Sequence, residues 1–355
     1  MKIVQKSALR VLLCVQLITG CQQDVTIAAH SDNSVRINHY VSHVSSVPAM
    51  SGFVAQLYVR ERLVTDTLAS NAGSGQVVLF VHGAGTPAEV AFDVPAPGFS
   101  WMEYLAQQGF SVFAMDMTGY GRSTRPLVMN DQCNLSAEQQ LELFDESCSP
   151  SYSFAATTMA SDWDDIDAVV TYLQKLRGVE KVHLVGWSQG GPRAAGYAAL
   201  HPEKVANIVL LAPAYSRTLP ATADQVAIAG TAMTKQSRDD FFGNWDRQSS
   251  CIDQYDAQVA EVIWQDMLAS DPVGASWGSG VRRAPRTPTF GWTTKEVSAT
   301  QTPIMMVIGS LDGQVNPQAV ADFYEDLGSS QKVLLEMPCA SHNAMWEKDA
   351  QQLYE

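Results

Sequence analysis

The chain has 355 residues, of which 46% are hydrophobic and 9% aromatic, enough for a sizeable buried core. This composition excludes disorder as the main state of the chain. Aspartate and glutamate outnumber lysine and arginine by 37 to 23, so the formal net charge is -14. A surface this acidic repels the phosphate backbone of nucleic acids, which excludes nucleic-acid binding as the expected function.

The first twenty residues have the features of an export signal. Lys2, Lys6 and Arg10 form a basic start. The apolar run that follows is shorter than the about 20 residues needed to span a bilayer. It ends in ITGC at Cys21, which resembles the lipobox of bacterial lipoproteins. The resemblance implies removal of residues 1–20, acylation of the Cys21 sulfur and export to the outer membrane, facing the periplasm or exterior. An ordinary signal peptide with a chance cysteine is the alternative.

Residues 21–50 are polar and lack a helical or strand period over most of their length, so we expect a tether there. After it, short β-branched apolar runs alternate with helical patterns, which predicts an α/β fold with a mostly parallel central sheet and helices on both faces. The expected strands are Phe53–Val64, Val77–Val81, Val112–Met115, Val182–Val185, Ile208–Leu211, Ile304–Ile308 and Val333–Leu335. The expected helices are Trp101–Gln107, Met159–Leu176, Pro192–Leu200, Pro317–Leu327 and Asn343–Leu353.

Residues 214–301 interrupt this alternation and are too long for a simple crossover between two strands. They contain helical patterns over Ala223–Thr234 and Gln254–Ala269. An insertion of this size beyond the strand ends is expected to form a helical cap, or lid, inserted after the sixth core strand. The remaining segments, 51–213 and 302–355, then form one core.

The strongest indication of chemistry is Gly-Trp-Ser-Gln-Gly at 186–190, which follows an apolar strand and precedes a helix rich in alanine and glycine. This context predicts a nucleophile elbow, in which Ser188 occupies a strained strand-to-helix turn. The Gly-x-Ser-x-Gly motif alone is not specific, because Gly-Ala-Ser-Trp-Gly at 274–278 also matches it but has no apolar strand pattern before it and no helical pattern after it. Context therefore selects Ser188 over Ser276, and a plain turn serine is the alternative.

A serine nucleophile needs a base, and histidine has a suitable unperturbed pKa. Of seven histidines, only His201 and His342 follow Ser188, as the chain order of such an elbow requires. His201 ends the helix that begins at the serine, so it is expected to be remote. His342 follows a strand, and Asp312 follows the strand before that one, at the edge where α/β sites are built. We expect His342 as the base and Asp312 as its orienting acid; a capping histidine and a turn-forming aspartate are the alternatives.

The glycine-rich turn Val-His-Gly-Ala-Gly at 81–85 closes another strand. Its backbone can offer N–H groups, and we expect the amides of Ala84 and Gln189 to form an oxyanion hole, with His82 supporting the loop. The chain has no pair of histidines at HExxH spacing, and its cysteines are too scattered for a zinc site. We therefore expect neither a metal nor a cofactor.

The motifs HGAG, DMTGYGRS, GWSQGG, SLDGQV and ASHNAMWE stand in the order found in capped α/β-hydrolases, and the chain resembles this superfamily over about residues 52–353. The resemblance implies a serine hydrolase that cleaves a small-molecule carboxylic ester through an acyl-enzyme. A lactonase, a carbon–carbon bond hydrolase and an aminopeptidase are alternatives on the same machinery. A non-catalytic surface binding module on this fold is an alternative of a different class.

Four cysteines remain once the export signal and Cys21 are set aside. Export places them where thiols oxidise, and four cysteines allow three pairings. Cys133 and Cys148 lie 15 residues apart in the weakly periodic excursion 122–158, so we expect a disulfide that staples it. A bridge between Cys251 and Cys339 would tie the cap to the loop before the predicted base, although nothing local specifies it. Four free thiols are the alternative.

The cap is rich in tryptophan, with Trp245, Trp264, Trp277 and Trp292 among its residues. Two interpretations stay open for these side chains. They pack a small core within the cap, or they line an apolar substrate pocket.

Overall fold

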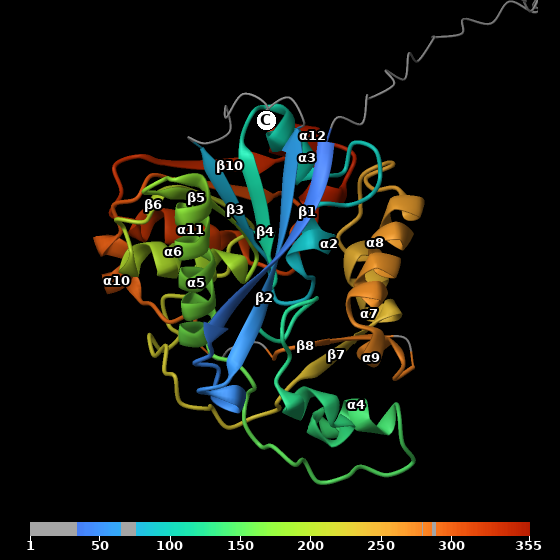
Figure 1. Cartoon of the computed structure of the whole chain (residues 1–355). Coiled ribbons are helices and arrows are strands. Elements are labelled where there is room, and N and C mark those ends of the chain that lie inside the picture. Colours follow the sequence, from blue (N-terminus) through green and yellow to red (C-terminus); the bar gives the residue numbers. More distant parts are fainter. Residues whose placement is uncertain (1–33, 65–75, 279, 286–288) are drawn as a thin grey trace, which may run out of the picture. The chain divides into compact units, whose positions relative to one another are not determined.

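A computed structural model describes residues 34–64, 76–278, 280–285 and 289–355 (Figure 1). The expected export signal, Cys21 and the tether up to residue 33 lie outside the described residues. No helix within the described ranges is long and apolar enough to cross a membrane.

The described chain is built on an eight-stranded sheet with the order β1-β2-β4-β3-β5-β6-β9-β10. β1 and β2 pair antiparallel, as do β2 and β4, whereas every pair from β4 to β10 is parallel. The strands are β1 (Ser34–Val44), β2 (Val54–Val64), β3 (Val77–Val81), β4 (Ser111–Met115), β5 (Val182–Trp187), β6 (Val205–Leu211), β9 (Ile304–Gly309) and β10 (Lys332–Met337). The prediction of a mostly parallel central sheet is therefore confirmed.

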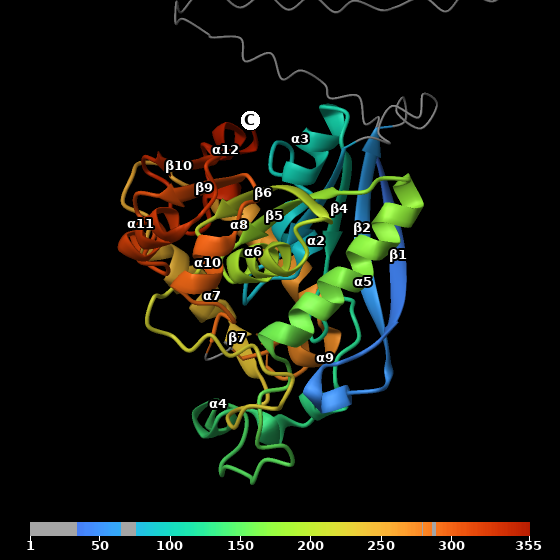
Figure 2. The same ribbon diagram turned by 90° about the vertical axis from the view of Figure 1, so that its left-hand side faces the viewer.

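Helices cover both faces of the sheet, and this explains why the sequence of β3 is apolar throughout. Val77, Leu79 and Val81 belong to one hydrophobic cluster, and Val78 and Phe80 belong to the other. Successive side chains of a strand point to opposite faces, so a strand between two helical layers has no polar side. Figures 1 and 2 show α5 (Met159–Arg177) and α8 (Ala257–Ser270) on the two sides of the sheet.

The first cluster includes side chains of α5 (Met159–Arg177), α6 (Gly190–Leu200), α10 (Thr294–Ala299) and α11 (Pro317–Asp326). The second includes side chains of α2 (Ala88–Phe92), α3 (Trp101–Gln107), α7 (Arg238–Asp246), α8 (Ala257–Ser270) and α12 (Ala350–Tyr354). The last predicted helix is instead a short 3-10 turn, η5 (Ala344–Trp346), followed by α12.

The tether predicted over residues 21–50 is wrong for its described part. Residues 34–44 form β1, which pairs along its whole length with β2 and makes one edge of the sheet. Arg36, Asn38, Tyr40 and Ser42 are exposed, and the residues between them are at least half-buried. An edge strand of this kind needs only one apolar face, so its sequence lacks the continuous apolar run of the central strands.

The cap lies between β6 and β9. It contains α7, α8, α9 (Pro272–Ala275) and α10, with a two-stranded antiparallel sheet of β7 (Thr234–Ser237) and β8 (Gly280–Arg283). The helix predicted over Gln254–Ala269 corresponds to α8, but the one predicted over Ala223–Thr234 is absent from this described stretch. The backbone of this stretch is hydrogen-bonded to the excursion 122–158 instead: the Ala155 N–H donates to the Ile228 carbonyl at 2.8 Å.

Three of the four cap tryptophans pack in hydrophobic cores. Trp245, Trp264 and Trp292 are each at most 2% exposed. Trp245 and Trp264 belong to the cluster that also holds α8, and Trp292 packs against Phe323 of α11. These contacts favour the core-packing interpretation for the three, whereas Trp277 is half-buried beneath the Arg282 guanidinium.

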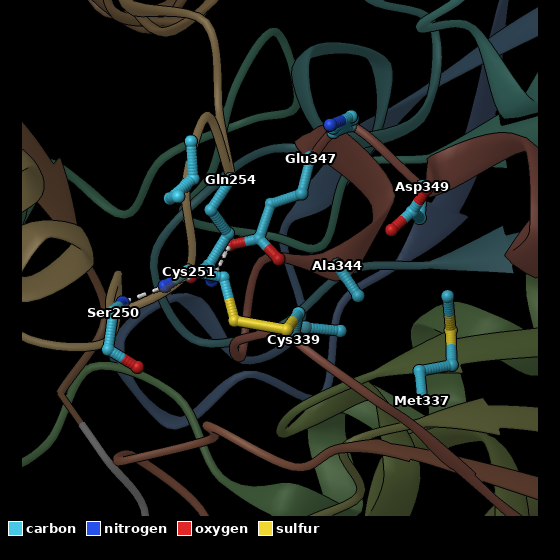
Figure 3. A pocket seen from close by; sticks show the side chains of 11 residues that line it. Ser250, Cys251, Gln254, Met337, Cys339, Ala344, Glu347 and Asp349 are labelled. Carbon is cyan, nitrogen blue, oxygen red and sulfur yellow. Dashed lines mark hydrogen bonds between the residues drawn. A yellow bond between two sulfur atoms is a disulfide. The ribbon is translucent and has the colours of Figure 1, made fainter.

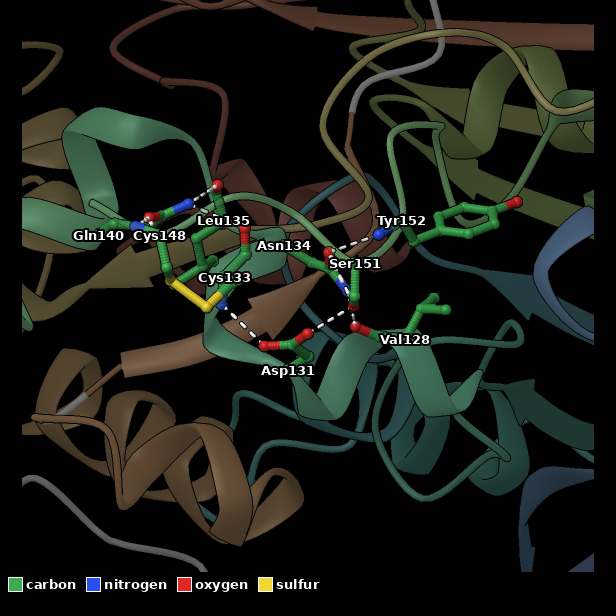
Figure 4. The surroundings of a disulfide bond; sticks show 9 residues. All are labelled: Val128, Asp131, Cys133, Asn134, Leu135, Gln140, Cys148, Ser151 and Tyr152. Atoms are coloured by element: carbon green, nitrogen blue, oxygen red, sulfur yellow. Dashed lines mark hydrogen bonds between the residues drawn. A yellow bond between two sulfur atoms is a disulfide. The ribbon is translucent and has the colours of Figure 1, made fainter.

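The structure joins Cys133 to Cys148 and Cys251 to Cys339. Figure 4 shows the first bridge within the excursion, where the Gln140 side chain forms hydrogen bonds with the backbone of both cysteines. Gln140 Nε2 donates to the Cys133 carbonyl, and its Oε1 accepts the Cys148 N–H, both at 2.8 Å. The second bridge connects the cap segment after α7 to the loop after β10.

Candidate active site

Ser188 stands on a sharp turn between β5 and α6, as the elbow motif predicts. Its φ is 57°, in the left-handed region that a side chain rarely adopts, and this strain persists only where the surroundings enforce it. The helix after it approaches β3 so closely that a Cβ on Gly190 would lie 2.3 Å from the Val81 carbonyl oxygen. The Ser188 N–H donates to the Leu211 carbonyl of β6 at 2.9 Å, which fixes the turn against the sheet.

His342 and Asp312 form a buried pair at the carboxyl ends of the neighbouring strands β10 and β9. The His342 Nδ1 and Asp312 Oδ2 atoms lie 2.9 Å apart, and the two residues are 2% and 7% exposed. The other carboxylate oxygen of Asp312 accepts the N–H groups of Gln314 and Val315, at 2.8 and 2.9 Å. When Nδ1 carries the proton it donates to Asp312, and Nε2 is the nitrogen left to accept a proton.

Trp187 connects the serine turn to the histidine loop. Its indole Nε1–H donates to the His342 carbonyl at 2.9 Å, and the two rings lie 5.5 Å apart between centroids. Because Trp187 directly precedes Ser188, the structure brings the predicted nucleophile, base and acid to one edge of the sheet. Such an edge, at the carboxyl ends of parallel strands, is where α/β proteins place their ligands.

The glycine-rich turn after β3 lies directly beside the serine. A Cβ on Gly83 would be 2.9 Å from the Ser188 Cβ and 3.1 Å from the Trp187 carbonyl oxygen, so only glycine fits there. Ala84 is the next residue of this turn, and Gln189, immediately after Ser188, is the N-cap residue of α6. The two residues predicted for the oxyanion hole therefore stand on the two loops that adjoin the nucleophile.

His82 supports this loop, as predicted, through hydrogen bonds of both ring nitrogens. Its Nε2 accepts the Met117 N–H at 3.1 Å, so Nδ1 carries the proton and donates to the Gly83 carbonyl at 2.7 Å. Complete burial, and then the charge of Arg193, hold the pKa of His82 well below its usual range. The side chain is thus neutral and fixed in one tautomer.

Two residues that support the site carry no sequence pattern that would identify them. Arg193 of α6 donates from Nη1 to the carbonyls of His82 and Gly83, each at 2.9 Å. Gln248 of the cap accepts from the His342 backbone. Each contact joins residues about a hundred positions apart, so only the folded chain reveals it.

The rejected candidates lie away from the elbow. Ser276 is exposed at the end of α9, and its hydroxyl donates to the Val273 carbonyl at 2.7 Å. His201 caps the far end of α6. In the described ranges, no group of three or more histidine, cysteine, aspartate and glutamate side chains is placed to hold a metal ion.

A cavity of about 400 Å³ lies where the cap meets the histidine loop (Figure 3). Its lining contains the Cys251–Cys339 disulfide and Glu347, and includes neither Ser188 nor His342. The remaining lining residues are Ser250, Ile252, Gln254, Met337, Ala340, Ala344, Lys348 and Asp349. This cavity therefore adjoins the loop that carries the predicted base without reaching the base itself.

Comparison with known proteins places this geometry in context. A hydrolase of Comamonas testosteroni, acting on 2-hydroxy-6-oxononadienedioate and 2-hydroxy-6-oxononatrienedioate, is 25% identical over 150 residues, which are 41% of this chain and 38% of that protein. The curated relatives are matched over less than half of their own length.

Two solved structures share the fold over most of the chain. A thermophilic esterase from Thermogutta terrifontis superposes with a TM-score of 0.54 at 16% identity, covering 89% of this chain and 95% of the esterase. A meta-cleavage product hydrolase from Pseudomonas fluorescens IP01 gives a TM-score of 0.53 at 17% identity, covering 88% and 94%.

The sequence profile of the alpha/beta hydrolase fold matches residues 76–349, which is well over half of the chain. These residues hold the elbow, the glycine-rich turn and the buried Asp312–His342 pair. The resemblance expected from the motifs is thus confirmed at the level of fold and family. The chain is a member of the alpha/beta hydrolase family.

Proposed function

We propose that this protein is a serine hydrolase that cleaves a carboxylic ester through an acyl-enzyme. The observation that carries the proposal is the strained Ser188, φ 57°, beside the glycine-rich turn and next to the residue that bonds His342. Strain of this kind costs of order 1–3 kcal/mol and is kept mainly where function needs it. A buried histidine–carboxylate pair at the same edge supplies the base that a serine nucleophile requires.

The chemistry follows from these positions. Ser188 Oγ attacks the carbonyl carbon while His342 Nε2 takes its proton, and the amides of Ala84 and Gln189 stabilise the oxyanion. When the tetrahedral intermediate collapses, the alcohol leaves with the proton from His342. Water then attacks the acyl-enzyme by the same route and releases the acid. Asp312 orients the imidazole and stabilises its charged form without itself taking the proton.

Hydrolysis of a carbon–carbon bond is the second candidate. It is favoured by the local similarity to the Comamonas testosteroni hydrolase and by the fold shared with the meta-cleavage product hydrolase. A lactone is a third type of substrate for the same machinery. These reactions differ in the bond broken and not in the nucleophile, so a substrate panel separates them.

A serine-directed fluorophosphonate probe tests the proposed function. Wild type is expected to be labelled at Ser188, and Ser188→Ala is expected to fold, lose labelling and lose nearly all ester hydrolysis. Binding and the oxyanion hole alone typically leave about 10³–10⁴-fold over water when a triad member is lost. Ser276→Ala is the matched control and keeps full activity. If folded wild type is not labelled, the non-catalytic binding module becomes the better interpretation.

A panel of p-nitrophenyl esters of rising chain length, with a lactone, an aminoacyl anilide and a vinylogous 1,5-diketone, distinguishes the reaction types. We expect the esters to be cleaved fastest. Preferential cleavage of the diketone would assign the protein to the carbon–carbon hydrolases instead.

We also propose that the protein is exported and anchored by an acylated Cys21, on the basis of the ITGC sequence after the basic and apolar start. Incorporation of labelled palmitate is expected in wild type and absent from Cys21→Ser. If wild type incorporates no palmitate, an ordinary signal peptide with an unacylated cysteine is the explanation; equal labelling of both proteins would place the acyl group at a site other than Cys21.

A further inference from the structure

Gln248 is a cap residue with direct bonds to both loops of the predicted acid and base. Its side-chain oxygen accepts the N–H of Gly313 at 2.8 Å and the N–H of His342 at 3.2 Å. Gly313 directly follows Asp312, so one amide oxygen bonds the backbone at both catalytic loops. The Nε2 group of the same side chain donates to the Asn244 carbonyl in α7 at 2.9 Å.

These bonds bear on the geometry of the pair. Asp312 and His342 are 30 residues apart and stand on loops that follow different strands. Their side chains meet at 2.9 Å only if the two backbones keep a fixed separation. A shared acceptor fixes that separation and satisfies two backbone donors at once. A buried donor left without an acceptor is unfavourable, so the loops shift if the acceptor is removed.

Gln248 is itself held firmly in place. It is 6% exposed, its N–H donates to the Trp245 carbonyl at 2.9 Å, and its own carbonyl accepts from Gln254 Nε2 at 3.1 Å. The disulfide between Cys251 and Cys339 attaches the segment three residues farther along to the position three residues before His342. A catalytic geometry is most precise when the groups behind it are themselves fixed.

A third connection runs through Glu347, which lies beside the disulfide in Figure 3. One of its carboxylate oxygens accepts the Ser341 N–H at 2.9 Å, and the other accepts from Gln254 Nε2 at 3.1 Å. The Lys348 N–H donates back to the Gln254 carbonyl at 2.9 Å. The cap segment 248–254 is therefore bonded to the histidine loop on both sides of His342.

We propose that Gln248 is a positioning residue of the hydrolase site, contributed by the cap, which sets the separation of the Asp312 and His342 loops. The inference rests on the proposed function, because it needs this pair to act as acid and base. Gln248 touches no reacting atom, so its loss affects the rate of the chemical step more than substrate binding. Displacement of a catalytic group by about 1 Å can lower a rate about 10²-fold.

The test compares Gln248→Met, which keeps the size and removes the acceptor, with Gln140→Met. Gln140 is a matched control because it is equally buried, also bonds three backbone groups beside a disulfide, and has no bond to either catalytic loop. For Gln248→Met we expect kcat for an ester and the rate of fluorophosphonate labelling to fall by about tenfold to a hundredfold, with KM within twofold. Gln140→Met is expected to lower the Tm while leaving kcat per labelled molecule unchanged.

Two further variants keep the result interpretable. Gln248→Glu retains an acceptor oxygen at the same reach and is expected to restore most of the kcat that methionine loses. Gln248→Asn withdraws the oxygen by one methylene with less disturbance of packing, and it is expected to lose kcat even if the methionine variant fails to fold.

Wild-type kcat in both Gln248→Met and Gln248→Asn, or equal losses in Gln248→Met and Gln140→Met, would overturn the inference while leaving the proposed function intact. Absence of labelling in wild type would instead refute the proposed function, and the positioning role with it.

Discussion

Arg193 joins three parts of the site from within an otherwise apolar helix. It is 1% exposed, and its Nε donates to Asp162 of α5 at 2.7 Å. Its Nη1 holds the carbonyls of His82 and Gly83, and its guanidinium lies 5.5 Å from the centre of the Tyr120 ring. A buried ion pair carries a large desolvation cost, so its value here lies in fixing the glycine-rich turn beside the nucleophile.

Arg193→Met is expected to destabilise the protein by about 3–5 kcal/mol, because it leaves the Asp162 carboxylate buried without its partner. Asp162→Asn is also expected to destabilise, and the double variant Arg193→Met/Asp162→Asn to be more stable than the sum of the single losses. Urea unfolding of all four proteins measures this coupling. The double variant is still expected to have a lowered kcat, since the turn has lost both bonds. Additive losses would show that the pair is not coupled.

The sequence was sufficient to predict the residues whose place is set by local context. Ser188, Asp312 and His342 each follow an apolar strand, and the parallel sheet aligns the carboxyl ends of its strands. The roles of Arg193 and Gln248 were not predictable, because their partners are distant in the sequence. Arg193 lies 111 positions from His82 and 110 from Gly83, and Gln248 lies 94 positions from His342. Nothing in a polar stretch such as Arg-Gln-Ser-Ser marks one glutamine as buried.

The excursion 122–158 is attached to the cap rather than standing alone. Gln139 Nε2 donates to the Lys235 carbonyl at 2.6 Å, and its Oε1 accepts the Lys235 N–H at 2.9 Å, as a neighbouring strand would do for β7. A small cluster of Met129, Leu135, Ala156 and Met233 packs beneath. So small a core makes the Cys133–Cys148 bridge important for this element.

Removal of each disulfide is expected to have a different effect. In Cys133→Ser/Cys148→Ser the unfolded chain is no longer constrained by a bridge between residues 15 positions apart. This variant is therefore expected to lose about 3 kcal/mol of stability with kcat unchanged. Cys251→Ser/Cys339→Ser is expected to lower kcat as well, since Cys339 lies in the loop that carries the predicted base. Urea unfolding and ester kinetics measure both effects, after peptide mapping without reductant verifies the pairings. A full kcat in the second variant would separate that bridge from catalysis.

The central strands were predictable because both of their faces are buried. β3 is apolar at every position because both of its faces are covered. β1 has one exposed face, and the histidine, asparagine and serine residues in its sequence conceal the strand pattern. The segment Ala223–Thr234 has the composition of a helix, yet its backbone bonds go to the excursion. Tertiary contacts of this kind override local propensity and cannot be read from the segment itself.

The stability of the whole molecule depends on pH through a carboxyl buried at the end of β4. Asp116 accepts the N–H groups of Ala88 and Arg122 at 2.8 and 3.0 Å. Its complete burial, and then the charge of Glu89, raise its pKa from 3.8 to about 7. Between these two pH values the folded state holds more protons than the unfolded one. This group therefore makes the protein less stable as the pH rises from about 4 to about 7, and its effect is constant above that range.

Asp116→Asn tests this contribution. The difference in unfolding free energy between wild type and variant is expected to shift against wild type as the pH rises through this window, by at most about 1.4 kcal/mol per pH unit. Urea unfolding at pH 5, 6, 7 and 8 measures it, with Asp224→Asn, at an exposed cap position, as the control. A difference that does not vary with pH would show that Asp116 has no raised pKa.

The covalent bond between Cys251 and Cys339 also limits how far the cap can separate from the core. While the disulfide is intact, the cap segment around Cys251 cannot part from the loop that leads to His342, whatever the rest of the cap does.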